Sequence, residues 1–275
     1  MQKLVFFDID GTLVTPKNEL PETTIKAITL LKENGHLPII ATGRPPKMLE
    51  PIAKELGIDS FISLNGQYIV LEGQPIFRQT LPTDYLEELI QASYDNGQRT
   101  FLITKDDIIG NTFMGEMLQD SEFLTMVSTY LNDIPDDVTL EMFMRMTEKP
   151  LKRERYEDEE ILSAYIHTDE SQDAYYKERF VDLHFTRATP LFTEVLLKGH
   201  HKGTGIQRIL DKLGQDMKNT IAFGDGLNDL EMIKTVQVGV SMGNGRDALK
   251  EAADYVTTHV EEDGIFNALK KLELI

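Results

Sequence analysis

The chain has 275 residues, which is long for one domain and comfortable for two. Its 46 Asp and Glu against 28 Lys and Arg give a formal net charge of −18, so its surface repels nucleic acid and anionic membranes. It contains no cysteine, which excludes disulfides and thiolate chemistry. No segment approaches the roughly 20 apolar residues that span a bilayer, and the first apolar run is too short for a signal peptide. A cytoplasmic protein is expected, with neither nucleic acid nor a membrane as its partner.

The strongest signal lies at residues 4–14, which read LVFFDIDGTLV. The apolar run at 4–7 has the length and bulk of a buried parallel strand, and Gly11 lets the chain turn out of the sheet. Asp8 and Asp10 follow two positions apart, so both carboxylates face the same way. Like charges this close are unfavourable unless a cation neutralises them or one carboxylate holds a proton. The pair therefore predicts a metal, a shared proton, or both.

An alternation of strands and helices follows, as far as about residue 64. It implies right-handed crossovers and a parallel sheet, whose ligands bind beyond the carboxyl ends of the strands. Thr42 and Asn65 each follow such a strand end, as Asp8 does. The expected elements are a helix at 21–34, a strand at 37–41, a helix at 45–56 and a strand at 60–64.

Residues 82–190 change character and are interpreted as an inserted α+β domain. A helix is expected at 85–94 and strands at 100–104 and 161–167. The methionine-rich stretch between them is expected to fill an irregular core, and the charged run at 152–160 to be solvated. Arg187 and Glu194 fall where the insertion rejoins the core and are candidates for contact with a substrate.

The last part returns to the pattern of a parallel sheet. Together, residues 1–81 and 191–275 are predicted to form one Rossmann-like, doubly wound α/β core. Its expected elements are a returning strand at 192–197, a helix at 203–213, a strand at 220–223 that ends at GDGLND, and a strand at 236–241 that ends in a glycine-rich loop.

Each strand-end motif is weak by itself. An Asp-x-Asp pair can be a hydrogen-bonded turn, Lys202 alone is most simply a surface lysine, and Asp225 with Gly226 is most simply an ordinary turn. Their order along the chain is what gives them weight. Two carboxylates, a hydroxyl beside a glycine, a lysine at a helix start and a second acidic loop are all expected at one edge of one sheet.

This set of motifs resembles the haloacid dehalogenase (HAD) superfamily of phosphohydrolases, in particular its Cof-type branch (type IIB) with a large α/β cap. The resemblance implies a Mg²⁺-dependent phosphatase that hydrolyses a small phosphorylated metabolite, either a sugar phosphate or a phosphorylated cofactor, through an aspartyl-phosphate. The inserted domain would be the cap that selects the substrate. The matching motifs are DIDGTL at 8–13, Thr42-Gly43-Arg44, Lys202 within GHHKGTGI, GDGLND at 224–229 and GVSMGNG at 239–245.

The acidic residues can be assigned distinct roles. Asp8 is the candidate nucleophile, because attack by a carboxylate on phosphorus splits one difficult step into two. Asp10 is the candidate general acid and base, provided that burial among charges keeps its side chain able to exchange a proton near neutral pH. Asp8 and Asp225 would supply carboxylates to Mg²⁺, and the resemblance adds the backbone carbonyl of Asp10 as a ligand. Asp229 is expected to orient waters or Lys202 from behind the metal ligands.

The phosphate oxygens need donors as well. Thr42 offers a hydroxyl, Gly43 an unobstructed amide and Lys202 a point charge at a helix start. Asn228 can donate its side-chain amide, and the backbone amide of Ile9 lies beside the nucleophile.

Three neighbouring residues are harder to assign. His200 and His201 adjoin Lys202, but a loop position is favoured over catalysis for both. Arg44 either contacts the phosphate or pairs with an acid near the site, and the sequence does not decide between these two roles.

Other functions fit part of the pattern. A phosphoacceptor receiver domain also uses acids, a Thr and a Lys at strand ends, but it is about half this length and lacks a second acid at the position of Asp10. A phosphomutase or phosphotransferase could share every motif, and a regulatory protein that binds sugar phosphates could keep the fold without turnover. The substrate and the oligomeric state are not predictable from the sequence.

Overall fold

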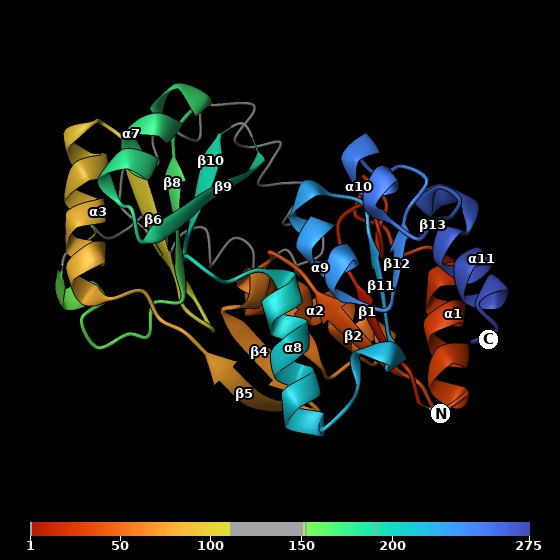
Figure 1. Ribbon diagram of the computed structural model, residues 1–275. Coiled ribbons are helices and arrows are strands. Elements are labelled where there is room, and N and C mark those ends of the chain that lie inside the picture. The colour runs from red at the N-terminus through yellow and green to blue at the C-terminus, as the bar shows by residue number, and fades with distance from the viewer. Residues whose placement is uncertain (1, 111–150, 152, 190) are drawn as a thin grey trace. The chain divides into compact units, whose positions relative to one another are not determined.

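The computed structural model describes residues 2–110, 151, 153–189 and 191–275 (Figure 1). The methionine-rich stretch of the sequence falls almost entirely outside these residues. The chain divides into two compact units: Met1–Arg44, Leu49–Phe77 and His200–Ile275 form the first, and Pro45–Met48 with Arg78–Gly199 form the second. Among the residues described, no helix has both the length and the apolar character that a membrane crossing requires.

The first unit is built on an eight-stranded sheet with the order β13-β12-β11-β1-β2-β3-β4-β5. From β13 to β3 every neighbouring pair is parallel, whereas β4 runs antiparallel to β3. The predicted α/β class is confirmed, and the sequence reading missed the antiparallel edge. The strands are β1 (Leu4–Phe7), β2 (Leu37–Ala41), β3 (Phe61–Ser63), β4 (Tyr68–Leu71), β5 (Gln74–Arg78), β11 (Thr220–Gly224), β12 (Val238–Ser241) and β13 (Tyr255–Val256).

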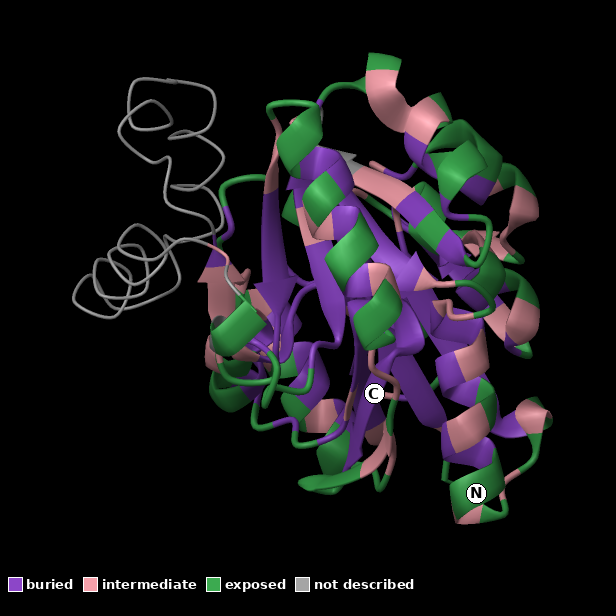
Figure 2. Cartoon of the chain, turned by 90° about the vertical axis from the view of Figure 1, so that its left-hand side faces the viewer, coloured by how far each residue is buried: buried purple, intermediate pink, exposed green. Residues whose placement is uncertain are grey.

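Both faces of this sheet are covered, as a doubly wound fold requires. Val5 and Phe7 of β1 belong to one apolar cluster, with side chains from α1, α2 and α11, whereas Leu4 and Phe6 belong to another, with side chains from α8, α9 and α10. This alternation follows from the period of two in a strand. Figure 2 shows the burial of each residue along the chain, with strands that are mostly buried and helices that carry both buried and exposed residues.

The three helices expected in the first unit, at 21–34, 45–56 and 203–213, are present, and their ends differ from the predictions by at most one residue. The helices are α1 (Glu22–Glu33), α2 (Pro46–Leu56), α8 (Lys202–Leu213), α9 (Leu230–Thr235), α10 (Asp247–Ala252) and α11 (Gly264–Lys271), with short 3₁₀ turns η1 (Leu64–Gly66), η4 (Met217–Asn219), η5 (Leu227–Asp229) and η6 (Val260–Glu262).

The second unit contains a five-stranded sheet with the order β7-β6-β8-β10-β9, in which every pair is antiparallel. One apolar cluster joins this sheet to helices α3 and α7 and contains Leu89, Tyr176 and Phe180. The elements are α3 (Thr83–Asp95), β6 (Arg99–Ile103), β7 (Ile108–Gly110), η2 (Arg153–Arg155), β8 (Ser163–His167), η3 (Glu170–Gln172), α7 (Asp173–Arg179), β9 (Leu183–Thr189) and β10 (Phe192–Leu197).

The prediction that residues 192–197 return to the parallel sheet is wrong. Strand β10 lies between β8 and β9 and pairs antiparallel with both, so the second unit continues to Gly199. The prediction failed because five of the six residues of β10 are buried. A central antiparallel strand that is buried on both faces has the same continuous apolar pattern as a parallel strand. The role of the second unit as a substrate-selecting cap stays a prediction.

Candidate active site

Two neighbouring strands of the first unit bring the two acidic motifs together. Strands β1 and β11 pair in register from Leu4 with Thr220 to Phe7 with Phe223, and the amide of Asp8 donates to the carbonyl of Phe223 at 3.0 Å. Asp8 and Asp225 therefore follow adjacent strand ends, although 217 positions separate them in the sequence. The expectation of one shared sheet edge holds for these two motifs.

Lys202 joins this edge from helix α8, of which it is the first residue. Its ammonium nitrogen lies 2.5 Å from Oδ1 of Asp8 and 2.6 Å from Oδ1 of Asp229, and the lysine side chain is fully buried. His201 caps the same helix by accepting a hydrogen bond from the amide of Thr204, so its side chain has a structural partner. Lys202 is thus the cation between two buried carboxylates, and the loop position favoured for His201 fits what is observed.

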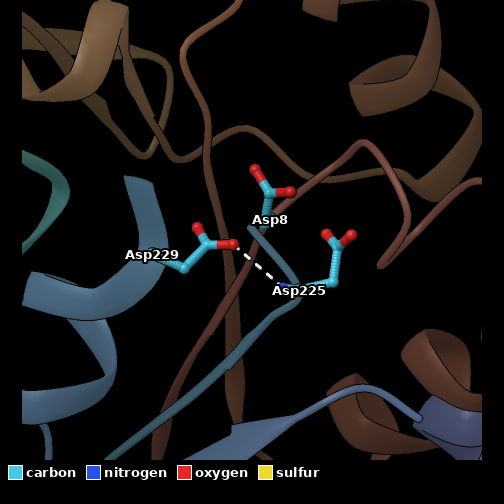
Figure 3. A group of neighbouring side chains, drawn as sticks. All are labelled: Asp8, Asp225 and Asp229. Carbon is cyan, nitrogen blue, oxygen red and sulfur yellow. Dashed lines mark hydrogen bonds between the residues drawn. The ribbon is translucent and has the colours of Figure 1, made fainter. Parts of the chain in front are cut away.

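Asp229 uses both carboxylate oxygens on protein groups. Its Oδ1 accepts from Lys202, and its Oδ2 accepts from the backbone amides of Asp225 and Gly226 at 3.0 and 2.9 Å. Figure 3 shows the bond to the backbone amide of Asp225, and it shows that the carboxylates of Asp8 and Asp225 point in the same direction. This arrangement suits the predicted role of orienting Lys202 and the loop, because both oxygens already accept hydrogen bonds from these groups.

The acidic residues of the site outnumber its one buried lysine. Burial, and then the charge of Asp229, raise the pKa of Asp8 well above its usual value, even though Lys202 opposes this rise. Burial and Asp229 also raise the pKa of Asp225, to about 7. Burial alone would lower the pKa of Lys202, but Asp229 and Asp8 raise it, so the lysine stays charged. The excess negative charge favours a cation or a proton.

The donor set fits a hard divalent cation. Oxygens of Asp8, Asp225 and Asp229 all lie within 4.8 Å of one another, and carboxylates are the protein ligands that Mg²⁺ prefers. Among the described residues, no amide or side chain donates a hydrogen bond to the carbonyl of Asp10, which leaves that oxygen available as well. Asp8, Asp225 and this carbonyl are therefore able to hold a metal, and the carboxylate of Asp229 lies close enough to contribute.

Asp225 is held in place by two side chains that the sequence reading did not single out. Thr12 donates to its Oδ1 at 3.2 Å, and Asn244 lies 3.5 Å from its Oδ2 while it donates to the carbonyl of Gly11 at 2.7 Å. Thr12 belongs to the DIDGTL motif and Asn244 to the glycine-rich loop, so the signal for both lay in motifs already noted. Gly11 has a φ of +77°, and a Cβ there would lie 2.3 Å from Oδ2 of Asp225.

Asp10 does not have the environment that was expected. Its side chain is 52% exposed rather than buried among charges. Arg44 donates to both of its carboxylate oxygens, from Nε at 3.0 Å and from Nη2 at 2.7 Å. Of the two roles left open for Arg44, pairing with an acid is the one observed. The expectation of burial was wrong because Asp10 has already left the sheet, one residue before the turn at Gly11.

Three of the expected phosphate donors, Ile9, Thr42 and Gly43, follow the ends of β1 and β2. Thr42 is buried and accepts a hydrogen bond from the amide of Arg44 at 3.0 Å. Within the described part of the chain, the backbone amides of Gly43 and Ile9 donate to no acceptor. Asn228 is exposed and immediately precedes Asp229 in η5. Phosphate binding by these residues stays a prediction.

The remaining candidates, Asn65, His200 and Arg187, each contact other residues of their own unit. Asn65 is buried with a φ of +50°, and its backbone amide donates to the carbonyl of Thr42. His200 packs against the ring of Phe77, with centroids 5.8 Å apart. In the second unit, Arg187 pairs with Asp173 at 2.6 Å, which gives it a partner inside that unit.

Comparison with known proteins matches a family model described as haloacid dehalogenase-like hydrolase to residues 5–269. A Bacillus subtilis protein named "Putative phosphatase YkrA" is 38% identical over 274 residues, which cover 99% of this chain and 98% of that protein. The B. subtilis 5-amino-6-(5-phospho-D-ribitylamino)uracil phosphatase YitU is 27% identical, with 98% of this chain and 96% of that protein covered. The solved structure of the HAD subclass IIB sugar phosphatase BT4131 covers both chains fully, with a TM-score of 0.78 and 27% identity.

The resemblance drawn from the motifs is thereby confirmed over nearly the whole chain, including the inserted unit. Both relatives are named as phosphatases, one of them as a "Putative phosphatase", and the structural neighbour is described as a member of the subclass that the motifs indicated. The chain belongs to the haloacid dehalogenase-like hydrolases.

Proposed function

We propose that the protein is a Mg²⁺-dependent phosphatase that hydrolyses a small phosphorylated metabolite through an aspartyl-phosphate on Asp8. The observation that carries the proposal is the buried contact of Asp8 with Lys202, beside the carboxylate of Asp225. A nucleophile fixed by a cation, next to a second cation-binding carboxylate, is the arrangement that phosphoryl transfer needs.

In the first step, an oxygen of Asp8 attacks phosphorus and the bond to the ester oxygen breaks. Asp10 gives its proton to that ester oxygen, so the alcohol leaves neutral. In the second step, Asp10 takes a proton from the water that attacks the phosphorus of the aspartyl-phosphate. Inorganic phosphate and the free carboxylate of Asp8 result, and Asp10 is protonated again.

The other residues hold the reactants. Lys202 keeps Asp8 oriented and attracts the phosphate, while Thr42, the amides of Gly43 and Ile9, and Asn228 bind phosphate oxygens. Asp8, Asp225 and the carbonyl of Asp10 would hold Mg²⁺, with Asp229 behind them. When bound, the cation offsets the charges of these carboxylates and of the substrate phosphate.

The class of substrate is inferred from the relatives. One named relative acts on a phosphorylated ribitylaminouracil and a structural neighbour on sugar phosphates. A sugar phosphate or a phosphorylated cofactor is therefore proposed here, with the second unit selecting between such substrates.

The test uses p-nitrophenyl phosphate and then a panel of phosphorylated metabolites, with and without EDTA. The Asp8→Asn variant is expected to release no phosphate, while Asp211→Asn, which changes an exposed carboxylate on α8, keeps full activity. Full activity of Asp8→Asn, or of the wild type in EDTA, would contradict the mechanism. Free phosphate that appears in step with substrate loss excludes a mutase or a phosphotransferase.

A further inference from the structure

The side chain of Asp10 is held at two points by one arginine. Nε and Nη2 of Arg44 each donate to a different carboxylate oxygen, at 3.0 and 2.7 Å. A guanidinium fork of this kind fixes the plane of a carboxylate as well as its position. Each oxygen keeps a further lone pair for proton exchange, and the Asp10 side chain is 52% exposed.

Arg44 is itself fixed on several sides. Its side chain is only 3% exposed, and its Nη2 also donates to Oδ1 of Asn18 at 2.7 Å. Its backbone amide donates to the hydroxyl of Thr42, and its carbonyl accepts from the hydroxyl of Ser63 at 2.7 Å. The guanidinium therefore has little freedom to move away from Asp10.

The side chain of Asn18 holds the guanidinium of Arg44 by accepting a hydrogen bond from it. Asn18 is 8% exposed and has a φ of +63°, and the amide nitrogen of its side chain has no partner among the described residues. A buried donor without an acceptor costs free energy, so the hydrogen bonds of Asn18 do not by themselves account for an asparagine at this buried position. Its one described side-chain contact is with Arg44.

We propose that Arg44 is a positioning residue that orients the carboxylate of Asp10 for proton transfer, with Asn18 fixing the guanidinium. The proposal rests on the proposed function, in which Asp10 exchanges protons with the leaving alcohol and with water. Arg44 acts through Asp10 and does not touch the substrate. Its loss therefore matters most where the leaving group needs a proton.

The test compares two substrates of similar shape, phenyl phosphate and p-nitrophenyl phosphate. Phenolate leaves poorly without a proton, whereas p-nitrophenolate leaves well. In Arg44→Met, kcat/KM, which reports the first step, is expected to fall about 100-fold for phenyl phosphate and less than about 10-fold for p-nitrophenyl phosphate. Asn18→Ala should change the ratio in the same direction by a smaller factor. Guanidinium chloride, but not sodium chloride at the same ionic strength, should restore part of the loss in Arg44→Met.

Arg208→Met is the matched control. Arg208 is a half-buried arginine of the same unit, stacked on Phe77 at 3.9 Å, and its loss should leave the ratio of the two substrates unchanged. An equal fall for both substrates in Arg44→Met, or no fall, overturns the proposal. If Arg44→Met does not fold in a thermal unfolding assay, Arg44→Lys and Asn18→Ala carry the same comparison. An inactive wild type or an active Asp8→Asn would instead refute the proposed function.

Discussion

Replacing Lys202 with Met is expected to destabilise the protein strongly. Lys202 is 0% exposed and lies within 2.6 Å of both Asp8 and Asp229, whose side chains are 7% and 0% exposed. Methionine keeps most of the stem volume but removes the charge, so two carboxylates face each other without a cation. Breaking a buried ion pair from one side costs about 3–5 kcal/mol. For a unit of this size, that corresponds to a fall in Tm of roughly 10 °C.

The pH dependence of this loss has a definite sign. Without the lysine, the pKa of Asp8 rises further, because the one charge that opposes its rise is gone. The folded variant therefore binds protons more readily, and its deficit relative to wild type should shrink as the pH falls. Mg²⁺ should stabilise the variant more than the wild type, since it replaces a missing positive charge.

Thermal unfolding in EDTA, at neutral and at acidic pH, measures this effect. A double variant that combines Lys202→Met with Asp229→Asn should lose less stability than the two single variants together, by about 1–3 kcal/mol. A loss below about 1 kcal/mol for Lys202→Met, or strict additivity in the double variant, would refute the reasoning.

Three further predictions concern the groups around Asp225 and Asp10. Because burial and Asp229 raise the pKa of Asp225 from 3.8 to about 7, the metal-free protein should lose stability, on the order of 4 kcal/mol, as the pH rises through this window. Thermal unfolding of wild type against Asp225→Asn isolates this loss; saturating Mg²⁺ should remove much of it, and identical pH profiles would contradict the assignment. Gly11→Ala should weaken Mg²⁺ binding, measured by calorimetry, at least about tenfold, because the new Cβ would lie 2.3 Å from the carboxylate of Asp225. Gly35→Ala is the control for backbone strain alone, since Gly35 has a φ of +79° and a Cβ there would have no atom within 4 Å. Asp10→Asn should slow phosphate release about 100-fold or more while Mg²⁺ affinity changes less than about threefold, because the ligand proposed for Asp10 is its backbone carbonyl; a collapse of metal affinity in a titration would contradict that role.

Much of the fold was predictable because the strands of the first unit are short, apolar and separated by amphipathic helices. The elements at 4–7, 37–41 and 220–223 were found within a residue of their ends, since a buried parallel strand has a distinctive continuous pattern. That same pattern misled at β10, whose neighbours on both sides bury it in an antiparallel sheet. Strand patterns report burial, and the choice of pairing partner depends on segments far away in the chain.

The candidate site, too, was predictable from the sequence only in part. The sequence by itself determined that Asp8, Thr42, Lys202 and Asp225 belong to strand ends or helix starts, because turn residues and apolar periodicity are local properties. Only the tertiary structure decided which of these groups are neutralised and which are exposed. Lys202 lies between Asp8 and Asp229, which are buried, whereas Asp10 is exposed and pairs with Arg44. Charge pairing and desolvation arise between residues that the fold brings together, and no local pattern encodes them.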